Sequence, residues 1–234
     1  MELMLLEDHL RVIFVYHINF VYLNMKYEKF RYIYPPRPKN TFPPSDLDYW
    51  DNTTLIGQPK MNGSNATFFI GDGQCRAMNR HGESLGNCNI HSEVESLFKG
   101  KDGWYVINAE YMNKAKMDDW GDLFNHKLVI FDVLVYDSMH LLGSSTVDRL
   151  SILDKMFKSE ECKWNYLTQI SENIFRVKSY ESEFSDLFHD ITKVDMIEGL
   201  VLKRKSARLE NGIREENNSK WMLKTRKPHK NYKY

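Results

Sequence analysis

Residues 127–136 read KLVIFDVLVY, and this stretch is the most β-prone segment of the chain. Valine, isoleucine and aromatic side chains are enriched in strands because they pack well on a pleated surface. An almost unbroken apolar run is typical of a strand that is covered on both faces. We therefore predict a central strand over residues 127–136, with the rest of the sheet built around it.

Strand and helix signals follow one another along the rest of the chain. Residues 65–70 and 74–78 flank Gly71-Asp72-Gly73, which predicts a β-hairpin with a glycine turn. Further strands are predicted over 55–58, 104–110, 198–204 and 220–226, and helices over 91–98, 146–157 and 183–194, with Thr146 as the N-cap of the second helix. Many strands with a few interspersed helices predict an α+β fold with mainly antiparallel sheets.

The composition is that of a globular protein with balanced charge. Its 234 residues are 42% apolar, which is enough for a hydrophobic core and excludes a disordered or collagen-like chain. Because 32 basic residues balance 32 acidic ones, bulk charge alone cannot bind nucleic acid, although a local basic patch stays open. The three cysteines lack the spacing of a zinc site, and we interpret them as reduced thiols of a cytosolic protein.

The N-terminal part of the chain divides into two segments. Residues 10–23 (LRVIFVYHINFVYL) are apolar but too few to span a bilayer. Two interpretations stay open for them: an element packed on the domain, or part of an upstream extension, with Met25 as the natural start. Residues 34–49 hold five of the seven prolines, which favours an extended, non-helical arm. We expect this arm to pack on the domain rather than to serve as a proline-rich ligand.

The first candidate for chemistry is the lysine of Lys60-Met61-Asn62-Gly63-Ser64-Asn65, which follows a predicted strand. A lysine amine is a nucleophile only when it is deprotonated, and burial or neighbouring cations favour that form. The adjacent glycine permits close approach of a ligand to the backbone. Taken alone, this pattern is common, and a lysine in a surface turn would be the simpler interpretation.

Five further segments follow this lysine in order, and together they change the interpretation. They are Asn79-Arg80-His81-Gly82, Ala109-Glu110-Tyr111, Phe131-Asp132-Val133, residues 198–203 (EGLVLK) and residues 221–226 (WMLKTR). With them, residues 55–226 resemble the covalent nucleotidyltransferase superfamily, which contains ATP-dependent DNA ligases, RNA ligases and mRNA capping enzymes. Taken singly, each residue has a simpler interpretation, such as a core position for Phe131. The order of all the segments is what carries the resemblance.

The resemblance implies a role for each matching residue. Lys60 would attack the α-phosphate of ATP to form a lysyl-AMP intermediate, and Glu198 would bind a divalent metal, Mg²⁺ or Mn²⁺. The nucleotide-binding residues that it implies are Asn62, Gly63, Asn65, Arg80, Glu110 at the ribose, Phe131 stacked on the purine, Lys203, and Lys224 with Arg226 at the α-phosphate. These roles agree with phosphoryl transfer, in which catalysis consists mostly of positioning and charge neutralisation.

Three features bear on the branch of the superfamily. Asn65 stands where DNA ligases and capping enzymes usually have arginine, so K-x-N-G-x-N is nearer to the K-x-H-G-x-N of phage-type nick-sealing and RNA-editing RNA ligases. Asn62 departs from both the usual Asp and the usual His, and Arg226 stands where lysine is usual. The sequence ends eight residues after Arg226, so no C-terminal OB-fold domain is expected.

These observations lead to one expected organisation and function. We expect an ATP-grasp-like nucleotidyltransferase domain over 51–227, after an extension and proline-rich arm over 1–50 and before a basic tail over 228–234. The expected function is a phage-like, cytoplasmic, ATP-dependent RNA ligase that joins 5′-phosphate and 3′-OH ends of nicked duplex or single strands, with no membrane partner. A DNA nick ligase, a capping guanylyltransferase and a non-catalytic nucleic-acid-binding module stay open as alternatives, and so does the oligomeric state.

Overall fold

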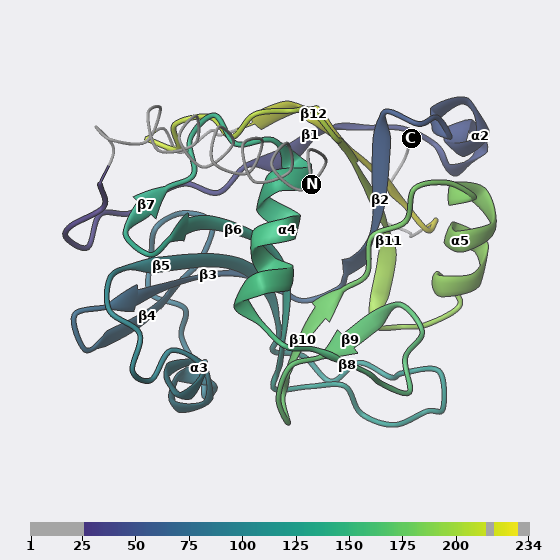
Figure 1. Ribbon diagram of the computed structural model, residues 1–234. Coiled ribbons are helices and arrows are strands. Elements are labelled where there is room, and N and C mark those ends of the chain that lie inside the picture. Colours follow the sequence, from purple (N-terminus) through teal and green to yellow (C-terminus); the bar gives the residue numbers. More distant parts are fainter. Residues whose placement is uncertain (1–25, 214–217, 229–234) are drawn as a thin grey trace, which may run out of the picture.

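Two β-sheets form the framework in the computed structural model, which describes residues 26–213 and 218–228 (Figure 1). The smaller sheet has the strand order β1 (Arg37–Thr41), β12 (Asn218–Arg226), β11 (Ile197–Arg204) and β2 (Leu55–Met61). The larger sheet runs β4 (Gln74–Met78), β3 (Ser64–Gly71), β5 (Tyr105–Met112), β6 (Lys127–Tyr136), β10 (Ile174–Val177), β9 (Leu167–Gln169) and β8 (Glu160–Glu161), with β7 (Met139–His140) paired to β6.

Most strand pairs among the described residues are antiparallel; β1–β12 and β6–β10 are parallel. The predicted α+β fold with mainly antiparallel sheets is therefore confirmed. Strand β6 lies between β5 and β10, as its apolar sequence predicts. The predicted hairpin is formed by β3 and β4, with Asp72 and Gly73 at positive φ in the turn.

Short helices cover the sheets. They are the 3₁₀ turn η1 (Pro44–Asp46), α2 (Leu47–Trp50), α3 (His91–Leu97), α4 (Thr146–Met156) and α5 (Phe184–Ile191). Helix α4 packs on β6, α5 on β11, and α3 on β4. No helix in the part of the chain that the structure describes is long and apolar enough to cross a membrane.

The N-cap of α4 corrects one prediction. Ser145, and not Thr146, caps the helix: its hydroxyl accepts a hydrogen bond from the Asp148 amide at 3.2 Å, and the Asp148 carboxylate accepts one from the Ser145 amide at 3.0 Å. Ser145 has the extended backbone of a cap residue, whereas Thr146 is 1% exposed and already belongs to the helix. Two neighbouring hydroxyl residues satisfy the same cap rule, so backbone geometry decides between them.

The proline-rich arm is partly helical, which corrects a second prediction. Residues 37–41 form β1 and pair with β12, as expected for a packed arm. Pro44, however, begins η1, and α2 follows directly. Proline suits the first position of a helix because its fixed φ is already helical and its missing N–H would have no partner there. The predictions for residues 10–23, for Met25 and for most of the 228–234 tail lie outside the described residues.

The chain passes from one sheet to the other between β2 and β3. Lys60 lies on β2 in the smaller sheet, and Ser64 begins β3 in the larger sheet. At Gly63 the backbone runs so close to β5 that a Cβ atom would lie 2.5 Å from the carbonyl oxygen of Tyr111. Glycine is therefore required at this crossing, and the segment that carries Lys60 is held at the junction of the two sheets.

Candidate active site

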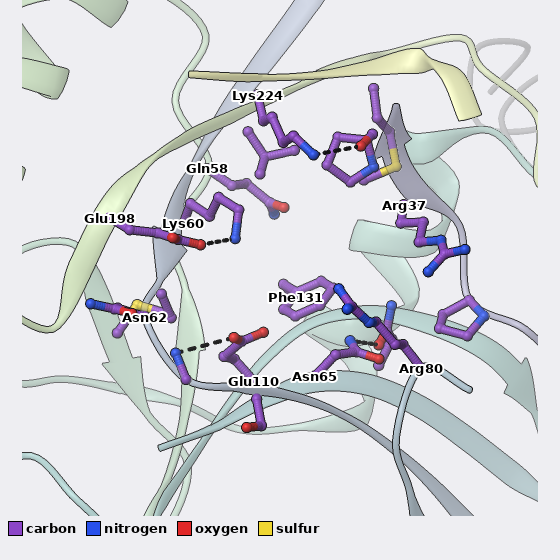
Figure 2. Close-up of a pocket in the computed structure, with 18 of the residues that line it drawn as sticks. Arg37, Gln58, Lys60, Asn62, Asn65, Arg80, Glu110, Phe131, Glu198 and Lys224 are labelled. Carbon is purple, nitrogen blue, oxygen red and sulfur yellow. Dashed lines mark hydrogen bonds and ion pairs between the residues drawn. The ribbon is translucent and has the colours of Figure 1, made fainter. Parts of the chain in front are cut away.

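A cavity of about 600 Å³ lies between the two sheets, and strands of both sheets line it (Figure 2). Every residue predicted to bind the nucleotide, the metal or the α-phosphate lines this cavity: Lys60, Asn62, Gly63, Asn65, Arg80, Glu110, Phe131, Glu198, Lys203, Lys224 and Arg226. These residues span more than 160 positions of the chain, and the pairing of β2, β11 and β12 on one side and β3, β5 and β6 on the other brings them together.

Glu198 contacts two positively charged side chains at one end of the cavity. Its Oε1 accepts a hydrogen bond from Lys60 Nζ, and its Oε2 lies 3.3 Å from Arg226 Nε. The strand register explains this arrangement, because Gly199 lies opposite Lys60 on one side and opposite Arg226 on the other. These three side chains are between 17% and 20% exposed, so the group is largely shielded yet open to a ligand from the cavity.

Lys224 adds a further positive charge to this end of the cavity. Its Nζ donates a hydrogen bond to the carbonyl oxygen of Pro38 at 3.2 Å. Burial lowers the pKa of Lys224, and the charges of Arg226 and Lys60 lower it further. Cations crowded together in this way repel one another, and a phosphate placed among them would relieve the repulsion.

Glu110 lies on β5, on the opposite wall. Its Oε1 accepts a hydrogen bond from the Gly63 amide at 3.1 Å. Burial raises the pKa of Glu110 to about 7, although the positive charge of Lys60 acts in the opposite direction. The carboxyl group can therefore carry a proton near neutral pH, and it can either accept a hydrogen bond from a hydroxyl group of a ligand or donate one to it.

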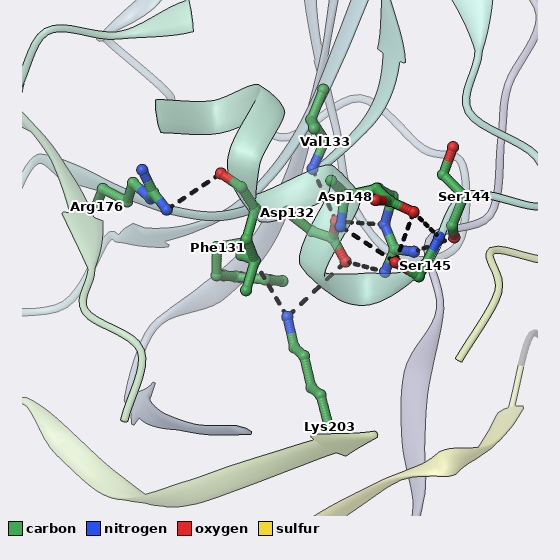
Figure 3. Close-up of polar contacts among 10 residues, drawn as sticks. Phe131, Asp132, Val133, Ser144, Ser145, Asp148, Arg176 and Lys203 are labelled. Atoms are coloured by element: carbon green, nitrogen blue, oxygen red, sulfur yellow. Dashed lines mark hydrogen bonds and ion pairs between the residues drawn. The ribbon is translucent and has the colours of Figure 1, made fainter. Parts of the chain in front are cut away.

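Phe131 lies on β6 with its side chain at the cavity, and a buried group of charges holds the backbone beside it (Figure 3). Lys203, which is 2% exposed, donates a hydrogen bond to the carbonyl oxygen of Phe131 at 3.2 Å and lies 3.8 Å from Asp132. Arg149 of α4 donates to both carboxylate oxygens of Asp132, at 2.8 and 3.1 Å. Burial alone would raise the pKa of Asp132, but Arg149 and Lys203 outweigh it and hold that pKa below its usual range.

The remaining predicted residues, Asn62, Asn65 and Arg80, also line the cavity. Asn62 Nδ2 donates to the carbonyl oxygen of Asp195 at 3.3 Å. Asn65 Nδ2 donates to Asn108 Oδ1 at 2.8 Å, while its own Oδ1 is buried and has no hydrogen-bond partner among the described residues. Arg80 is exposed, and its Nε donates to His81 Nε2 at 3.0 Å.

The donor set suits a metal that is shared with a substrate. Within residues 26–213 and 218–228, no group of three or more His, Cys, Asp or Glu side chains could hold a metal ion by itself. The cavity does hold two carboxylates, Glu198 and Glu110. Mg²⁺ is commonly bound by one or two carboxylates together with substrate phosphates, so these residues fit a metal that binds with a nucleotide.

Sequence reasoning missed several residues that line the cavity, among them Gln58 and Asn108. Gln58 is 2% exposed, donates to Ser179 Oγ at 3.0 Å, and leaves its Oε1 buried without a hydrogen-bond partner among the described residues. A signal for Gln58 was present, because residues two apart on a strand face the same side and Lys60 follows two positions later. Arg37 of the proline-rich arm also lines the cavity.

A sequence profile described as "ATP dependent DNA ligase domain" matches residues 43–224. The chain belongs to this family. The predicted membership of the covalent nucleotidyltransferase superfamily is thereby confirmed, and the chain carries an ATP-dependent ligase domain of the DNA or RNA ligase type. Family membership implies the use of ATP and a divalent metal.

Solved structures have a similar fold at low sequence identity. The structure "Pmar-Lig_Pre." aligns with a TM-score of 0.58 and 15% identity, over 83% of this chain and 47% of its own. A study of "Lig E DNA ligases" gives a TM-score of 0.50 and 14% identity, over 85% of this chain and 70% of its own. An "archaeal ATP-dependent RNA ligase" aligns with a TM-score of 0.47 and 17% identity, over 82% of this chain and 48% of its own. No curated protein matches the sequence.

The chain spans about half the length of most of these solved ligases. At identities of 14–15%, the similarity establishes the fold and leaves the substrate open.

Proposed function

We propose that this ligase-family protein is an ATP-dependent polynucleotide ligase, of the RNA ligase type by preference, which joins 5′-phosphate and 3′-OH ends through a lysyl-AMP intermediate at Lys60. The observation that supports this proposal is the convergence in one cavity of a lysine, two carboxylates, paired cations and an aromatic side chain. A pure binding module needs phosphate-binding cations, but it does not need a nucleophilic lysine beside a carboxylate and further cations.

In the first step, the deprotonated Nζ of Lys60 attacks the α-phosphorus of ATP. A nitrogen–phosphorus bond forms, the bond from the α-phosphorus to the bridging oxygen of the β-phosphate breaks, and pyrophosphate leaves. Lys224 and Arg226 are the cations proposed to neutralise the α-phosphate, and Glu198 would hold Mg²⁺ once Lys60 has left its ion pair. Phe131 would stack on the adenine, and Glu110 would bind the ribose through a hydroxyl group.

In the second step, AMP passes from Lys60 to the 5′-phosphate of a strand and forms a phosphoanhydride. In the third, a 3′-OH attacks the 5′-phosphorus and expels AMP, so that a phosphodiester bond replaces the anhydride. Both steps are again in-line displacements at phosphorus, for which the same cations serve.

The substrate class has two candidates, and each has an observation in its favour. A neutral Asn65 in place of arginine supports the RNA ligase type. The profile that matches residues 43–224 supports a DNA nick ligase. The test therefore uses the same nick in RNA and in DNA, with a single-stranded RNA as a third substrate.

The experiment incubates the full chain with α-labelled ATP or GTP and Mg²⁺ or Mn²⁺, followed by denaturing electrophoresis. Label from ATP on the wild type and on Lys193→Ala, but not on Lys60→Ala, is the expected result. Lys193 is a suitable control because it lies in an exposed ion pair with Asp190, outside the cavity. Sealing of nicked RNA, nicked DNA or single strands then assigns the substrate.

Three outcomes would overturn the proposal. Label from GTP alone would indicate a capping guanylyltransferase. Label that persists in Lys60→Ala would remove Lys60 as the nucleophile. No label from either nucleotide, even with Mn²⁺ and a nicked duplex present, would leave a non-catalytic nucleic-acid-binding module.

A further inference from the structure

The arm before β2 is built into the wall of the cavity. Pro35, Pro36, Arg37 and Pro38 all line it, although they precede Lys60 by more than twenty residues. The prolines restrict the backbone of this segment, so little conformational freedom remains to be lost when a ligand binds. The arm is therefore a preorganised part of the site.

Contacts at both ends hold the arm against opposite walls. Towards the smaller sheet, β1 pairs in parallel with β12, and Lys224 Nζ donates to the carbonyl oxygen of Pro38. Towards the larger sheet, the hydroxyl of Tyr32, just before the arm, donates a hydrogen bond to the carbonyl oxygen of Asn79 at 2.7 Å, in the turn that carries Arg80. The arm thus connects the lysine proposed to bind the α-phosphate with the turn that carries Arg80.

Arg37 and Arg80 point into the cavity from the same side in Figure 2, across from Lys60 and Glu198. The charge of Arg37 also contributes to the lowered pKa of Lys224, after burial and the charges of Arg226 and Lys60. The basic character of the cavity therefore extends beyond the Lys60–Glu198 end. Two guanidinium groups at one mouth of a cavity are suited to bidentate hydrogen bonds with phosphate oxygens.

We infer that Arg37 joins Arg80 in a second phosphate-binding position of this cavity, which holds a substrate phosphate other than the α-phosphate attacked by Lys60. The inference deepens the proposed function and rests on it. The phosphate has two possible sources: the β- and γ-phosphates of ATP, which leave as pyrophosphate, or the 5′-phosphate of the strand to be joined. The two sources act in different steps, so kinetics can separate them.

The chain offers a matched control in the same arm. Lys39 also lies on β1 and carries the same charge, but it is exposed and does not line the cavity. The pairing of β1 with β12 is irregular between Pro38 and Asn40, which interrupts the simple alternation of faces along this strand. Arg37→Ala, Arg37→Lys and Lys39→Ala are therefore compared, each in the full chain.

The experiment measures two rates for each protein. The first is formation of labelled lysyl-AMP from ATP, together with its reversal by added pyrophosphate. The second is transfer of AMP from the preloaded enzyme to a 5′-phosphorylated strand. Loss of a charge-assisted hydrogen bond predicts a reduction of about tenfold or more for Arg37→Ala in at least one rate, a smaller reduction for Arg37→Lys, and no change for Lys39→Ala. A slower first rate assigns the ATP phosphates, and a slower second rate alone assigns the strand phosphate.

The inference and the proposed function fail in different ways. If the wild type forms lysyl-AMP and Arg37→Ala matches Lys39→Ala in both rates, the inference is wrong and the function stands. If the wild type forms no lysyl-AMP, the proposed function is wrong, and calorimetric titration with inorganic pyrophosphate decides the inference. Weaker binding by Arg37→Ala than by Lys39→Ala would then support it, and equal binding would overturn it. Melting temperatures of all variants exclude misfolding as the cause.

Discussion

Replacing Arg149 by methionine tests how the wall of the cavity that carries Phe131 is held. Arg149 is completely buried, and Asp132 is 3% exposed. The guanidinium group donates two hydrogen bonds to Asp132 and a third to the carbonyl oxygen of Ser144, at 3.0 Å. Methionine fills a similar volume, so the substitution removes the charge and the donors with little change in packing.

The expected loss of stability follows from what remains around Asp132. Removing one partner of a buried ion pair costs about 3–5 kcal/mol, because the other charge stays buried. Lys203 at 3.8 Å and the Val133 amide at 2.9 Å still compensate Asp132 in part, so we expect about 3 kcal/mol. For a domain of this size, that corresponds to a decrease in Tm of about 6–12 °C.

The assay is urea unfolding followed by circular dichroism, at neutral pH and near pH 4. In the wild type, the lowered native pKa of Asp132 preserves its stabilising contribution down to the unfolded pKa, and the contribution is lost only as the pH falls through the native value. In Arg149→Met, burial remains while the main cation is gone, so the pKa of Asp132 should rise and the carboxylate should take up a proton as the pH falls towards 4. The difference between wild type and Arg149→Met should therefore shrink at low pH. Lys193→Met, in an exposed ion pair, serves as the control and should unfold with the wild type.

A double-mutant cycle with Asp132→Asn completes the test. The double variant should be more stable than the sum of the two single losses predicts, by about 1–3 kcal/mol, because the asparagine leaves no buried anion without its partner. A loss below about 1 kcal/mol for Arg149→Met, or strictly additive losses, would refute the reasoning that this pair is a tightly coupled buried ion pair.

The other predictions concern the cavity itself. Burial raises the native pKa of Glu110 to about 7, so the wild type should lose stability as the pH rises from about 4 to 7. Glu110→Gln should not lose stability for this reason. Equal shifts of the urea midpoint between pH 5 and pH 8 in both proteins would contradict the prediction. Lys224→Ala should require more ATP for half-maximal labelling, while Lys193→Ala should not; unchanged ATP dependence of Lys224→Ala would argue against a phosphate contact. Gly63→Ala places a Cβ atom 2.5 Å from the carbonyl oxygen of Tyr111, so its urea midpoint and its labelling should both fall, and wild-type values would show that the backbone relaxes easily.

Local patterns in the sequence were sufficient for much of the fold. The run of β-branched and apolar residues in β6 identified the central strand, and glycine at the turn identified the β3–β4 hairpin. Helix α4 was found because its apolar residues recur with helical spacing. Strands β8 to β10 were missed because they are two to four residues long, which is too short for a periodic pattern.

The sequence by itself also determined which residues were candidates for chemistry, because each lies in a short segment of recognisable composition, and it determined their order. Tertiary structure alone decided how they meet. Glu198 contacts both Lys60 and Arg226 because β11 pairs with β2 on one side and β12 on the other. The ammonium group of Lys203 faces Phe131 and Asp132 rather than solvent. Arg37 reaches the cavity because β1 pairs in parallel with a strand about 180 residues later. Such long-range pairing depends on the whole packed chain, and no local pattern encodes it.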